Sequence, residues 1–313
     1  MNKEYTLVTG AAGFIGSAVA NRLIELGNNV ITIDNLSTGD KSNLNKDLIF
    51  FEGDVFDTNI LDEVFKYNIK AILHIAGQSS GEISYDNPIY DLRSNTESTL
   101  LLLKYAKNNS CKKFIFASTM SVYGDQETEI VDEKSIPNPI SFYSVGKLAS
   151  ESYMKIYSKF GINCIALRLF NVYGPGQNLK NLRQGMVSIF LAQAFKCKSI
   201  LIKGSGDRFR DMIYIDDVVE AFIKSLNVNS DFRIYNVSTG TKTTVGEVIN
   251  SINGMFFGNL KIQYEGETPG DIFGIYGDNN LIKSDLDWSP KINFKDGLAN
   301  MYNWINRNKT DDL

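Results

Sequence analysis

The sequence predicts an α/β protein with a doubly wound parallel sheet and a smaller, interleaved α/β lobe near the C-terminus. Two patterns carry this prediction. Short runs rich in Val, Ile and Phe alternate with helical segments over the first 170 residues, which indicates parallel strands joined by right-handed crossovers. A glycine-rich turn, Gly10-Ala-Ala-Gly13-Phe-Ile-Gly16, also separates the first such run from the first helix.

Most of the predicted strands of this first part have apolar residues on both faces, as a sheet covered on both sides requires. They span residues 5–8, 29–34, 48–52, 71–75, 113–117 and 162–169. The first predicted helix, 14–26, has Ile15, Val19 and Leu23 at helical spacing. Two later segments are also long enough for helices: 90–107 and 142–160.

After Asn171 the alternation weakens, starting with a turn-rich junction at 172–177. We expect a helix at 184–196, a strand at 199–202 and a loop at 204–210. These are followed by a strand and a helix within 212–226, a strand at 232–237 that returns to the main sheet, and a final helix at 294–307. A nucleotide domain would then comprise 1–170 and about 211–238, and a substrate lobe about 171–210 and 239–313.

Composition excludes several classes of protein. Hydrophobic residues make up 43% of the chain and charged residues 22%, which is typical of a soluble globular protein. The net charge of −4 argues against a nucleic-acid binder that neutralises phosphates. We expect no membrane span and no secretory signal, because no apolar run is long enough and the first residues lead directly into a strand. The three cysteines lack metal-type spacing and indicate reduced thiols in a cytoplasmic protein.

The single histidine, His74, makes a histidine-based metal site or a Ser-His-Asp triad improbable, and we predict no metal site. His74 follows an apolar strand. We predict that it is a structural, hydrogen-bonded histidine rather than a catalytic one.

The glycine-rich turn predicts a Rossmann-type dinucleotide site. Gly10, Gly13 and Gly16 permit unusual backbone dihedrals and let the backbone approach a pyrophosphate. Phe14 and Ile15 open the helix, whose N-terminus offers N–H donors and the positive end of a dipole. The spacing is G-x-x-G-x-x-G rather than the common G-x-G-x-x-G, and the alternative is a tight turn that binds no ligand.

Asp34 ends the second predicted strand, where a carboxylate can bind the ribose diol of adenosine and repel a 2′-phosphate. This favours NAD over NADP; an aspartate that only stabilises its own turn is the alternative. Asp54 and Val55, after the third strand, are candidate adenine contacts with the same alternative. Asn35 and Ala76, beside these strand ends, are assigned to the same cofactor site.

Tyr143 and Lys147 form the candidate catalytic pair. At positions i and i+4 of a helix they lie on one face, and a nearby ammonium lowers the pKa of a phenol from about 10. We expect Lys147 to bring the pKa of Tyr143 towards neutrality, so that the tyrosinate is a general base for a hydroxyl. The spacing alone is a weak signal, but Ser118 and Thr119 precede the pair and strengthen it.

Nine motifs occur in order along the chain, at residues 9–16, 34–39, 74–77, 118–124, 143–147, 168–176, 210–217, 235–237 and 269–271. Each is loose, but their order is specific. Together they resemble the extended short-chain dehydrogenase/reductases, and among these the nucleotide-sugar epimerase/dehydratase group that is similar to UDP-glucose 4-epimerase. The resemblance covers nearly the whole chain.

The resemblance implies an NAD-dependent enzyme. Tyr143 would be the acid/base, Lys147 its cationic partner and a contact of the nicotinamide ribose, and Thr119 a hydroxyl that hydrogen-bonds the reacting C4 oxygen.

The resemblance also implies substrate contacts. Ser118 would lie beside Thr119 at the sugar, Asn171 would hold the diphosphate, and Arg210 and Asp271 would bind the nucleotide end. The family usually has an arginine at the diphosphate where this sequence has Thr268. Arg208 is the candidate replacement, since guanidinium groups suit phosphate oxygens; a solvated loop charge is the alternative.

Departures from the family pattern select the reaction. Dehydratases place Asp-Glu directly after the catalytic threonine, whereas Met120 and Ser121 stand here and cannot do that acid/base work. We expect an epimerase of UDP-hexose or UDP-N-acetylhexosamine that oxidises C4, lets the 4-keto sugar rotate and returns the hydride. The alternatives are a 4-keto-sugar reductase and an epimerase at another carbon. A non-catalytic dinucleotide sensor is a third, against which the complete Thr-Tyr-Lys set argues.

Two further features concern the sugar and the assembly. The loop 77–82 is more polar than this family suggests, and Ile275 resembles the position that limits the size of the sugar pocket. Family members commonly dimerise through a helix pair that corresponds to 90–107 and 142–160. Because residues 100–103 are all leucine, we expect a buried face and a homodimer, with burial against the sheet as the alternative.

Overall fold

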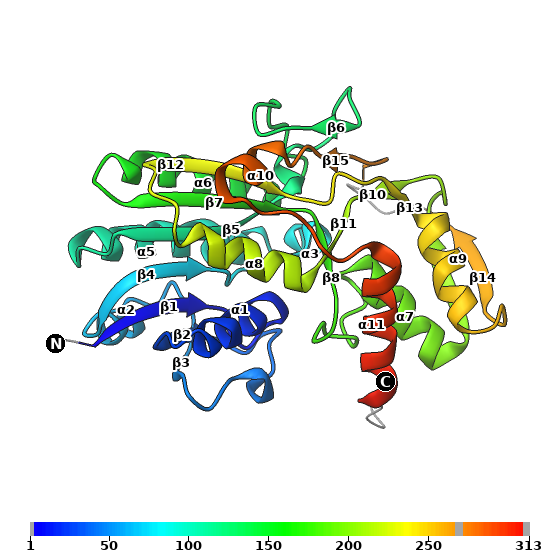
Figure 1. The fold of residues 1–313 in the computed structure, drawn as a ribbon, viewed down its shortest axis with the longest axis horizontal. Helices are drawn as coiled ribbons and strands as arrows, with labels where there is room; N and C mark the ends of the chain where they lie inside the picture. Colours follow the sequence, from blue (N-terminus) through cyan, green and yellow to red (C-terminus); the bar gives the residue numbers. More distant parts are fainter. Residues whose placement is uncertain (1–2, 267–271, 309–313) are drawn as a thin grey trace.

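The computed structural model describes residues 3–266 and 272–308, and its centre is a seven-stranded parallel sheet (Figure 1). The strand order is β12-β7-β5-β4-β1-β2-β3, so the chain builds outwards from β1 in both directions. The crevice outside the carboxyl ends of β1 and β4 is therefore the expected ligand position. The strands are β1 (Glu4–Thr9), β2 (Val30–Asp34), β3 (Ile49–Glu52), β4 (Asn68–His74), β5 (Lys113–Thr119), β7 (Asn163–Leu169) and β12 (Phe232–Val237).

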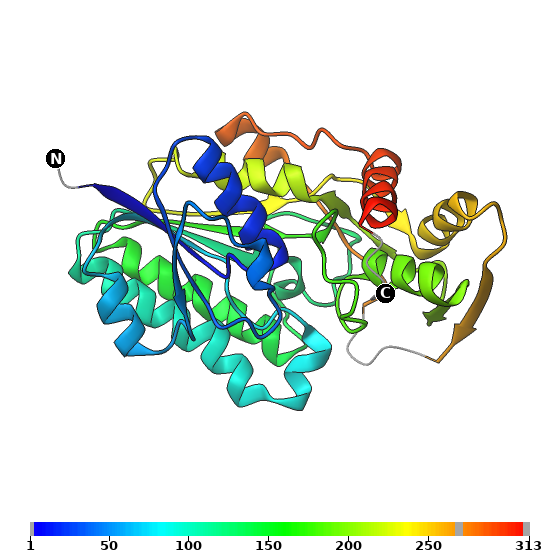
Figure 2. The ribbon, with the colours of Figure 1, turned by 90° about the horizontal axis from the view of Figure 1, so that it is seen from below.

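Helices cover both faces of the sheet, because side chains that alternate along the strands are apolar on both sides. Val8 and Ile115 belong to one buried cluster and Leu7 and Phe114 to another. The first cluster packs under α1 (Phe14–Glu25) and α8 (Ile215–Ser225). The second packs under α2 (Thr58–Val64), α5 (Ser98–Asn108) and α6 (Phe142–Ser158). Figure 2 shows the blue helix α1 and the cyan-to-green helices on opposite sides of the sheet.

The predicted strands of the parallel sheet are confirmed, including the return of 232–237 to the main sheet, where β12 pairs with β7. The predicted helix 90–107 is partly wrong: it is α4 (Pro88–Leu92), a π-helical turn (Arg93–Glu97) and α5. Hydroxyls explain the irregularity, because Ser98 and Thr99 donate to the carbonyls of Ser94 and Asn95 at 2.6 Å and compete with the regular ladder. Helices α2 and α3 (Gly81–Asp86) were not predicted.

The smaller lobe is built from short pairs of strands and three longer helices. Its helices are α7 (Met186–Cys197), α9 (Val245–Met255) and α11 (Phe294–Arg307). Its strand pairs are β9 (Ser199–Lys203) with β14 (Lys261–Glu265), and β10 (Phe209–Arg210) with β13 (Thr243–Thr244). Two pairs join it to the sheet domain: β8 (Asn171–Tyr173) with β11 (Met212–Tyr214), and β6 (Ile130–Val131) with β15 (Tyr276–Gly277). Helix α10 (Asn280–Leu286) packs by β12.

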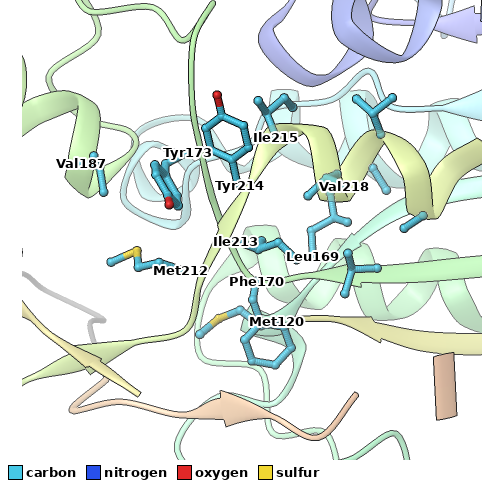
Figure 3. Close-up of a cluster of buried hydrophobic side chains, with 14 of the residues drawn as sticks. Met120, Leu169, Phe170, Tyr173, Val187, Met212, Ile213, Tyr214, Ile215 and Val218 are labelled. Carbon is cyan, nitrogen blue, oxygen red and sulfur yellow. The ribbon is translucent and has the colours of Figure 1, made fainter. Parts of the chain in front are cut away.

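The two parts share one hydrophobic core. Side chains from the ends of β5 and β7 meet side chains of β8, β11 and α7 in a continuous cluster (Figure 3). The predicted boundary near residue 170 falls inside this cluster, since Leu169, Phe170 and Tyr173 are all buried in it. In the part of the chain that the structure describes, no helix is long and apolar enough to cross a membrane.

Candidate active site

The turn between β1 and α1 requires glycine at two positions. Gly10 has φ +77°, in the region that only glycine adopts readily. A Cβ on Gly16 would lie 2.0 Å from the carbonyl oxygen of Gly10, so the helix packs against the turn with no room for a side chain. Gly13 is the N-cap of α1, and the first N–H groups of this 12-residue helix therefore border the crevice without a side chain over them.

A cavity lies in this crevice at the ends of β1, β2 and β4, and it contains most of the predicted cofactor residues. Tyr143 and Lys147 do not line it, but Lys147 is adjacent to it, since a Cβ on the lining residue Gly77 would be 3.5 Å from Lys147 Nζ. The predicted residues that do line it are Gly10, Gly13, Phe14, Ile15, Gly16, Asp34, Asn35, Asp54, Val55 and Ala76.

Asp34 fits both functions that the sequence suggested for it. Its two carboxylate oxygens accept hydrogen bonds from the backbone N–H groups of Ala12 and Leu36, each at 2.8 Å, so the side chain does hold its own turn. It also lines the cavity, and each oxygen keeps lone-pair capacity for a ribose hydroxyl. The side chain of Asn35 donates a hydrogen bond to Asp54 at 2.6 Å, which holds these two lining residues of the cavity together. A helix N-terminus, a glycine floor and a carboxylate together fit a dinucleotide.

His74 is a structural residue, as predicted. It is fully buried, with Nδ1 2.8 Å from the Thr9 hydroxyl and Nε2 3.1 Å from the Thr99 hydroxyl. Burial, and secondarily the charge of Lys147, lower the pKa of His74 well below its usual value, so the ring is neutral. It lines neither of the two cavities described here.

Tyr143, Lys147 and Thr119 come together at the carboxyl end of β5. Tyr143 is the second residue of α6, which begins at a capping box formed by Ser141 and Ser144. Lys147 follows one turn later, with its ammonium 5.7 Å from the centre of the Tyr143 ring. Thr119 ends β5, and its hydroxyl hydrogen-bonds Tyr143. All three side chains are buried.

The predicted shift in the pKa of Tyr143 towards neutrality is wrong. Burial raises the pKa of Tyr143 to about 12, with a hydrogen bond from Thr119 acting in the opposite direction. Lys147 donates to the carbonyl oxygen of Ala117 at 3.0 Å, and burial lowers its own pKa to about 8. The removal of water disfavours the charged form of each group and is the largest cause of both pKa shifts.

Asp91 also acts on this pair and was not predicted. Its carboxylate is buried and accepts hydrogen bonds from the side chains of Gln78, at 2.8 Å, and Asn95, at 3.2 Å. Its charge raises the pKa values of both Tyr143 and Lys147. Gln78 also donates to the carbonyl oxygen of Ser80 at 2.7 Å, which explains why the loop 77–82 is polar.

A second cavity begins beside α6 and extends into the smaller lobe. Ser79 and Gln184 line both cavities, so the two meet at this point. Met120 and Ser121 line the second cavity, and Ser121 lies 3.2 Å from the Thr119 hydroxyl. The predicted substrate residues Asn171, Arg208 and Arg210 line it as well.

The far end of this second cavity suits an anion. Arg208 donates to Ser205 and Lys203 carbonyls, and Arg210 donates to the carbonyl oxygens of Phe209, at 2.6 Å, and Phe273, at 3.2 Å. These contacts hold two guanidinium groups beside Lys203 at the cavity wall.

Asn171 Nδ2 is buried and has no hydrogen-bond partner within residues 3–266 and 272–308. A buried donor of this kind needs an acceptor, and a diphosphate oxygen would supply one. Asp271 and Thr268 lie outside the described residues.

Two predicted positions are corrected. Ser118 does not line either cavity; its hydroxyl donates to Glu151 Oε1 on α6 at 2.6 Å. Glu151 in turn accepts two hydrogen bonds from Arg168, at 3.0 and 2.7 Å. Ile275 is buried and does not line the second cavity, whereas Ile272 does. The sequence alone could not show which way these two side chains point, because that depends on how β5 and the segment 272–277 run in the fold.

Comparison with known proteins gives a family match over most of the chain. The sequence profile described as the NAD dependent epimerase/dehydratase family matches residues 6–238. A putative UDP-glucose 4-epimerase of Methanocaldococcus jannaschii is 35% identical over 307 residues, which cover 97% of this chain and 99% of that protein. A CDP-paratose 2-epimerase of Salmonella typhi is 30% identical over 95% of this chain and 98% of its own.

Two solved structures have the same fold. A UDP-glucose 4-epimerase of Thermotoga maritima, crystallised with UDP-glucose, superposes with a TM-score of 0.94 at 33% identity and covers 97% of this chain and 99% of its own. The UDP-glucose 4-epimerase of Thermus thermophilus in complex with NAD gives a TM-score of 0.91 at 30% identity, covering 98% and 100%.

Proposed function

Because this chain belongs to the NAD dependent epimerase/dehydratase family, we propose that it is a nucleotide-sugar 4-epimerase acting on a UDP-hexose or a UDP-N-acetylhexosamine. One observation carries the proposal. Thr119, Tyr143 and Lys147 line neither cavity but lie beside residues that do. Lys147 is next to Gly77 of the cavity suited to a dinucleotide, and the Thr119 hydroxyl lies 3.2 Å from that of Ser121, which lines the cavity suited to a sugar diphosphate. This is where a reacting carbon would have to lie between cofactor and base.

We assign the proton transfer to Tyr143. As the phenolate it would take the proton of the C4 hydroxyl, while Thr119 hydrogen-bonds the same oxygen. NAD, when bound, would supply the acceptor for the hydride that leaves C4 and, in its reduced form, the donor that returns this hydride to the opposite face of the 4-keto sugar. Lys147 keeps its charge beside the phenol, and Tyr143 returns the proton to the C4 oxygen at the end of the reaction.

Met120 and Ser121 support an epimerase rather than a dehydratase. They line the substrate cavity directly after Thr119, and neither a thioether nor a neutral hydroxyl can protonate and expel a hydroxyl group. An epimerase at another carbon is the second candidate, favoured by the similarity to the CDP-paratose 2-epimerase. A 4-keto-sugar reductase would use the same three residues.

We assign the diphosphate to Asn171 and Arg208, and the nucleotide end to Arg210 and Asp271. The unsatisfied Asn171 amide and the guanidinium groups at the far end of the cavity support this orientation, with the sugar towards Ser121.

We propose that the protein is a homodimer and acts in the cytoplasm. Large apolar side chains are exposed on α4 and at the start of α6, namely Ile89 (68%), Leu92 (53%) and Val145 (52%), and these helices pack against each other. Such a patch needs a partner surface. Cys111 and Cys164 are buried free thiols, as expected in a reducing compartment.

The test is proton NMR of the purified protein with UDP-glucose, UDP-galactose and both UDP-N-acetylhexosamines, with NAD present and NADH absent. Appearance of the C4 epimer from either direction is the expected result. No conversion of any substrate by protein that binds NAD would contradict the proposal, and stoichiometric consumption of NADH with a 4-keto sugar would identify a reductase.

A further inference from the structure

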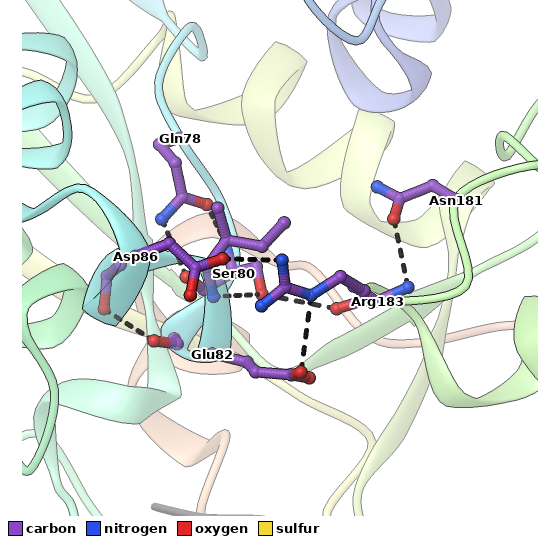
Figure 4. Close-up of polar contacts among 9 residues, drawn as sticks. Gln78, Ser80, Glu82, Asp86, Asn181 and Arg183 are labelled. Carbon is purple, nitrogen blue, oxygen red and sulfur yellow. Dashed lines mark hydrogen bonds and ion pairs between the residues drawn. The ribbon is translucent and has the colours of Figure 1, made fainter.

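The sugar end of the substrate cavity has a charged border. Arg183, in the segment before α7, extends its guanidinium group to the short helix α3 (Figure 4). Its Nη1 lies 2.6 Å from Asp86 Oδ2 and its Nε 3.3 Å from Glu82 Oε1. The Arg183 carbonyl also accepts a hydrogen bond from the Ser80 hydroxyl at 3.3 Å.

This border lies near the reacting atoms rather than near the nucleotide. Glu82 and Arg183 line the second cavity, and Asp86 lies behind them. Gly81, beside Glu82, packs on the beginning of α6, since a Cβ there would be 3.5 Å from Ser141 Oγ. Ser141 caps the helix in which Tyr143 is the second residue. The cations of the opposite end, Lys203, Arg208 and Arg210, are contributed by different segments.

The charges at this border do not balance. One guanidinium group faces two carboxylates, which leaves a net charge of about −1 beside the sugar when all three are ionised. The guanidinium also has its Nε and one Nη directed at these carboxylates, so a sugar carboxylate would compete with two carboxylates already in place. A neutral hydroxymethyl group has no such competitor.

We propose that Glu82, Asp86 and Arg183 select nucleotide sugars with a neutral sugar over those with a uronic acid. This inference rests on the proposed function, in which the sugar binds beside Tyr143 and Thr119. It adds the residues that discriminate against a charged sugar, which the three catalytic candidates do not do.

The experiment compares UDP-glucose with UDP-glucuronate, which carry the same nucleotide, by isothermal titration calorimetry on the NAD-loaded protein. Because all three side chains are partly exposed, we expect a moderate preference: UDP-glucuronate should bind about fivefold more weakly, and less so at high salt. The double variant Glu82→Gln/Asp86→Asn should remove most of this difference, and Arg183→Gln should enlarge it.

Glu63→Gln is the matched control. It removes one negative charge on α2, from an exposed ion pair with Lys66 just after that helix, and neither residue lines a cavity. The ratio of the two affinities should therefore be unchanged. Equal or tighter binding of UDP-glucuronate by the wild-type protein would overturn the inference, as would an undiminished difference between the two sugars in the double variant.

Turnover in the same samples separates this inference from the proposed function. Conversion of both sugars with equal binding would retain the epimerase and reject charge selection. Selective binding of UDP-glucose without any C4 conversion would retain the selection and reject the reaction. If neither nucleotide sugar binds, both are rejected.

Discussion

Glu151 on α6 accepts a 2.6 Å hydrogen bond from the hydroxyl of Ser118, the residue before Thr119 on β5. The same carboxylate forms a buried ion pair with Arg168 on β7. Glu151 lies two helical turns after Tyr143, so this contact fixes how α6 sits along the two strands. The separation of the Tyr143 phenol from the Thr119 hydroxyl depends on that alignment.

Glu151→Ala should lower the free energy of unfolding by about 3–5 kcal/mol, because it leaves the Arg168 guanidinium buried without its carboxylate. Ser118→Ala removes one hydrogen bond and keeps the ion pair, so a loss of about 1 kcal/mol is expected. Urea unfolding measures both. Equal stabilities of the two variants would mean that the ion pair contributes nothing to the packing of α6.

Tyr143→Phe should reduce turnover by at least about 10²-fold, because it removes only the oxygen that takes up the proton. NAD affinity, measured by titration calorimetry, should stay close to that of the wild-type protein, since Tyr143 does not line the dinucleotide cavity. Retained activity in this variant would refute the assignment of the base.

Lys147 should give the cofactor-free protein a distinctive dependence of stability on pH. Its pKa is lowered from 10.5 to about 8 in the folded state, so between these values the unfolded chain binds more protons. Stability should therefore rise with pH from about 8, by at most about 1.4 kcal/mol per unit. Above about pH 10 the raised pKa of Tyr143 acts in the opposite sense, because the unfolded phenol ionises first.

The Lys147→Met variant should lack this rise of stability with pH. Urea unfolding of both proteins at pH 7.5 and 9.5 measures the difference, and parallel behaviour would show that Lys147 titrates normally. In the pH profile of kcat/KM the same variant should need a higher pH than the wild-type protein to reach its full activity, because the phenolate loses its cation.

Gly16→Ala should abolish NAD binding or folding, because its Cβ would overlap the Gly10 carbonyl, which cannot move without opening the turn. Gly254→Ala is the matched control: it is in α9, a Cβ there meets nothing within 4 Å, and helix propensity should raise stability by up to about 1 kcal/mol. Thermal unfolding with and without NAD measures both. Normal NAD binding by Gly16→Ala would contradict the packing described here.

The double variant Leu92→Glu/Val145→Glu should convert the proposed dimer to a monomer, because two buried carboxylates per subunit would have no partner cations. Ile136→Glu changes a more exposed residue (81%) outside these helices and should leave the assembly unchanged. Light scattering after size exclusion measures the mass. A monomeric wild-type protein would contradict the proposed dimer. A double variant that remains dimeric would show that the interface lies elsewhere.

Local signals were sufficient to predict the order of the elements and the glycine turn. Gly10 is needed for its own positive φ and Gly16 for its close packing on the nearby Gly10, and the strands are recognised by their own composition. The close approach of Ala76 to Gly10, in contrast, is one that only the fold creates. The pKa of Tyr143 and the role of Ser118 could not be predicted in the same way. Both depend on groups that only the fold brings close: water is excluded from Tyr143 by packing around α6, and Ser118 meets a carboxylate 33 residues away.

Figure 1 shows β12, a late strand of the chain, beside β7 at one edge of the sheet. During synthesis on a ribosome, the backbone of β7 therefore has no neighbour on that side until residues 232–237 have emerged. A nascent chain of about 200 residues would present this apolar edge to other chains, and such edges promote aggregation. Truncated products that end before β12 are thus expected to require a chaperone or to be degraded, although they contain the whole glycine turn.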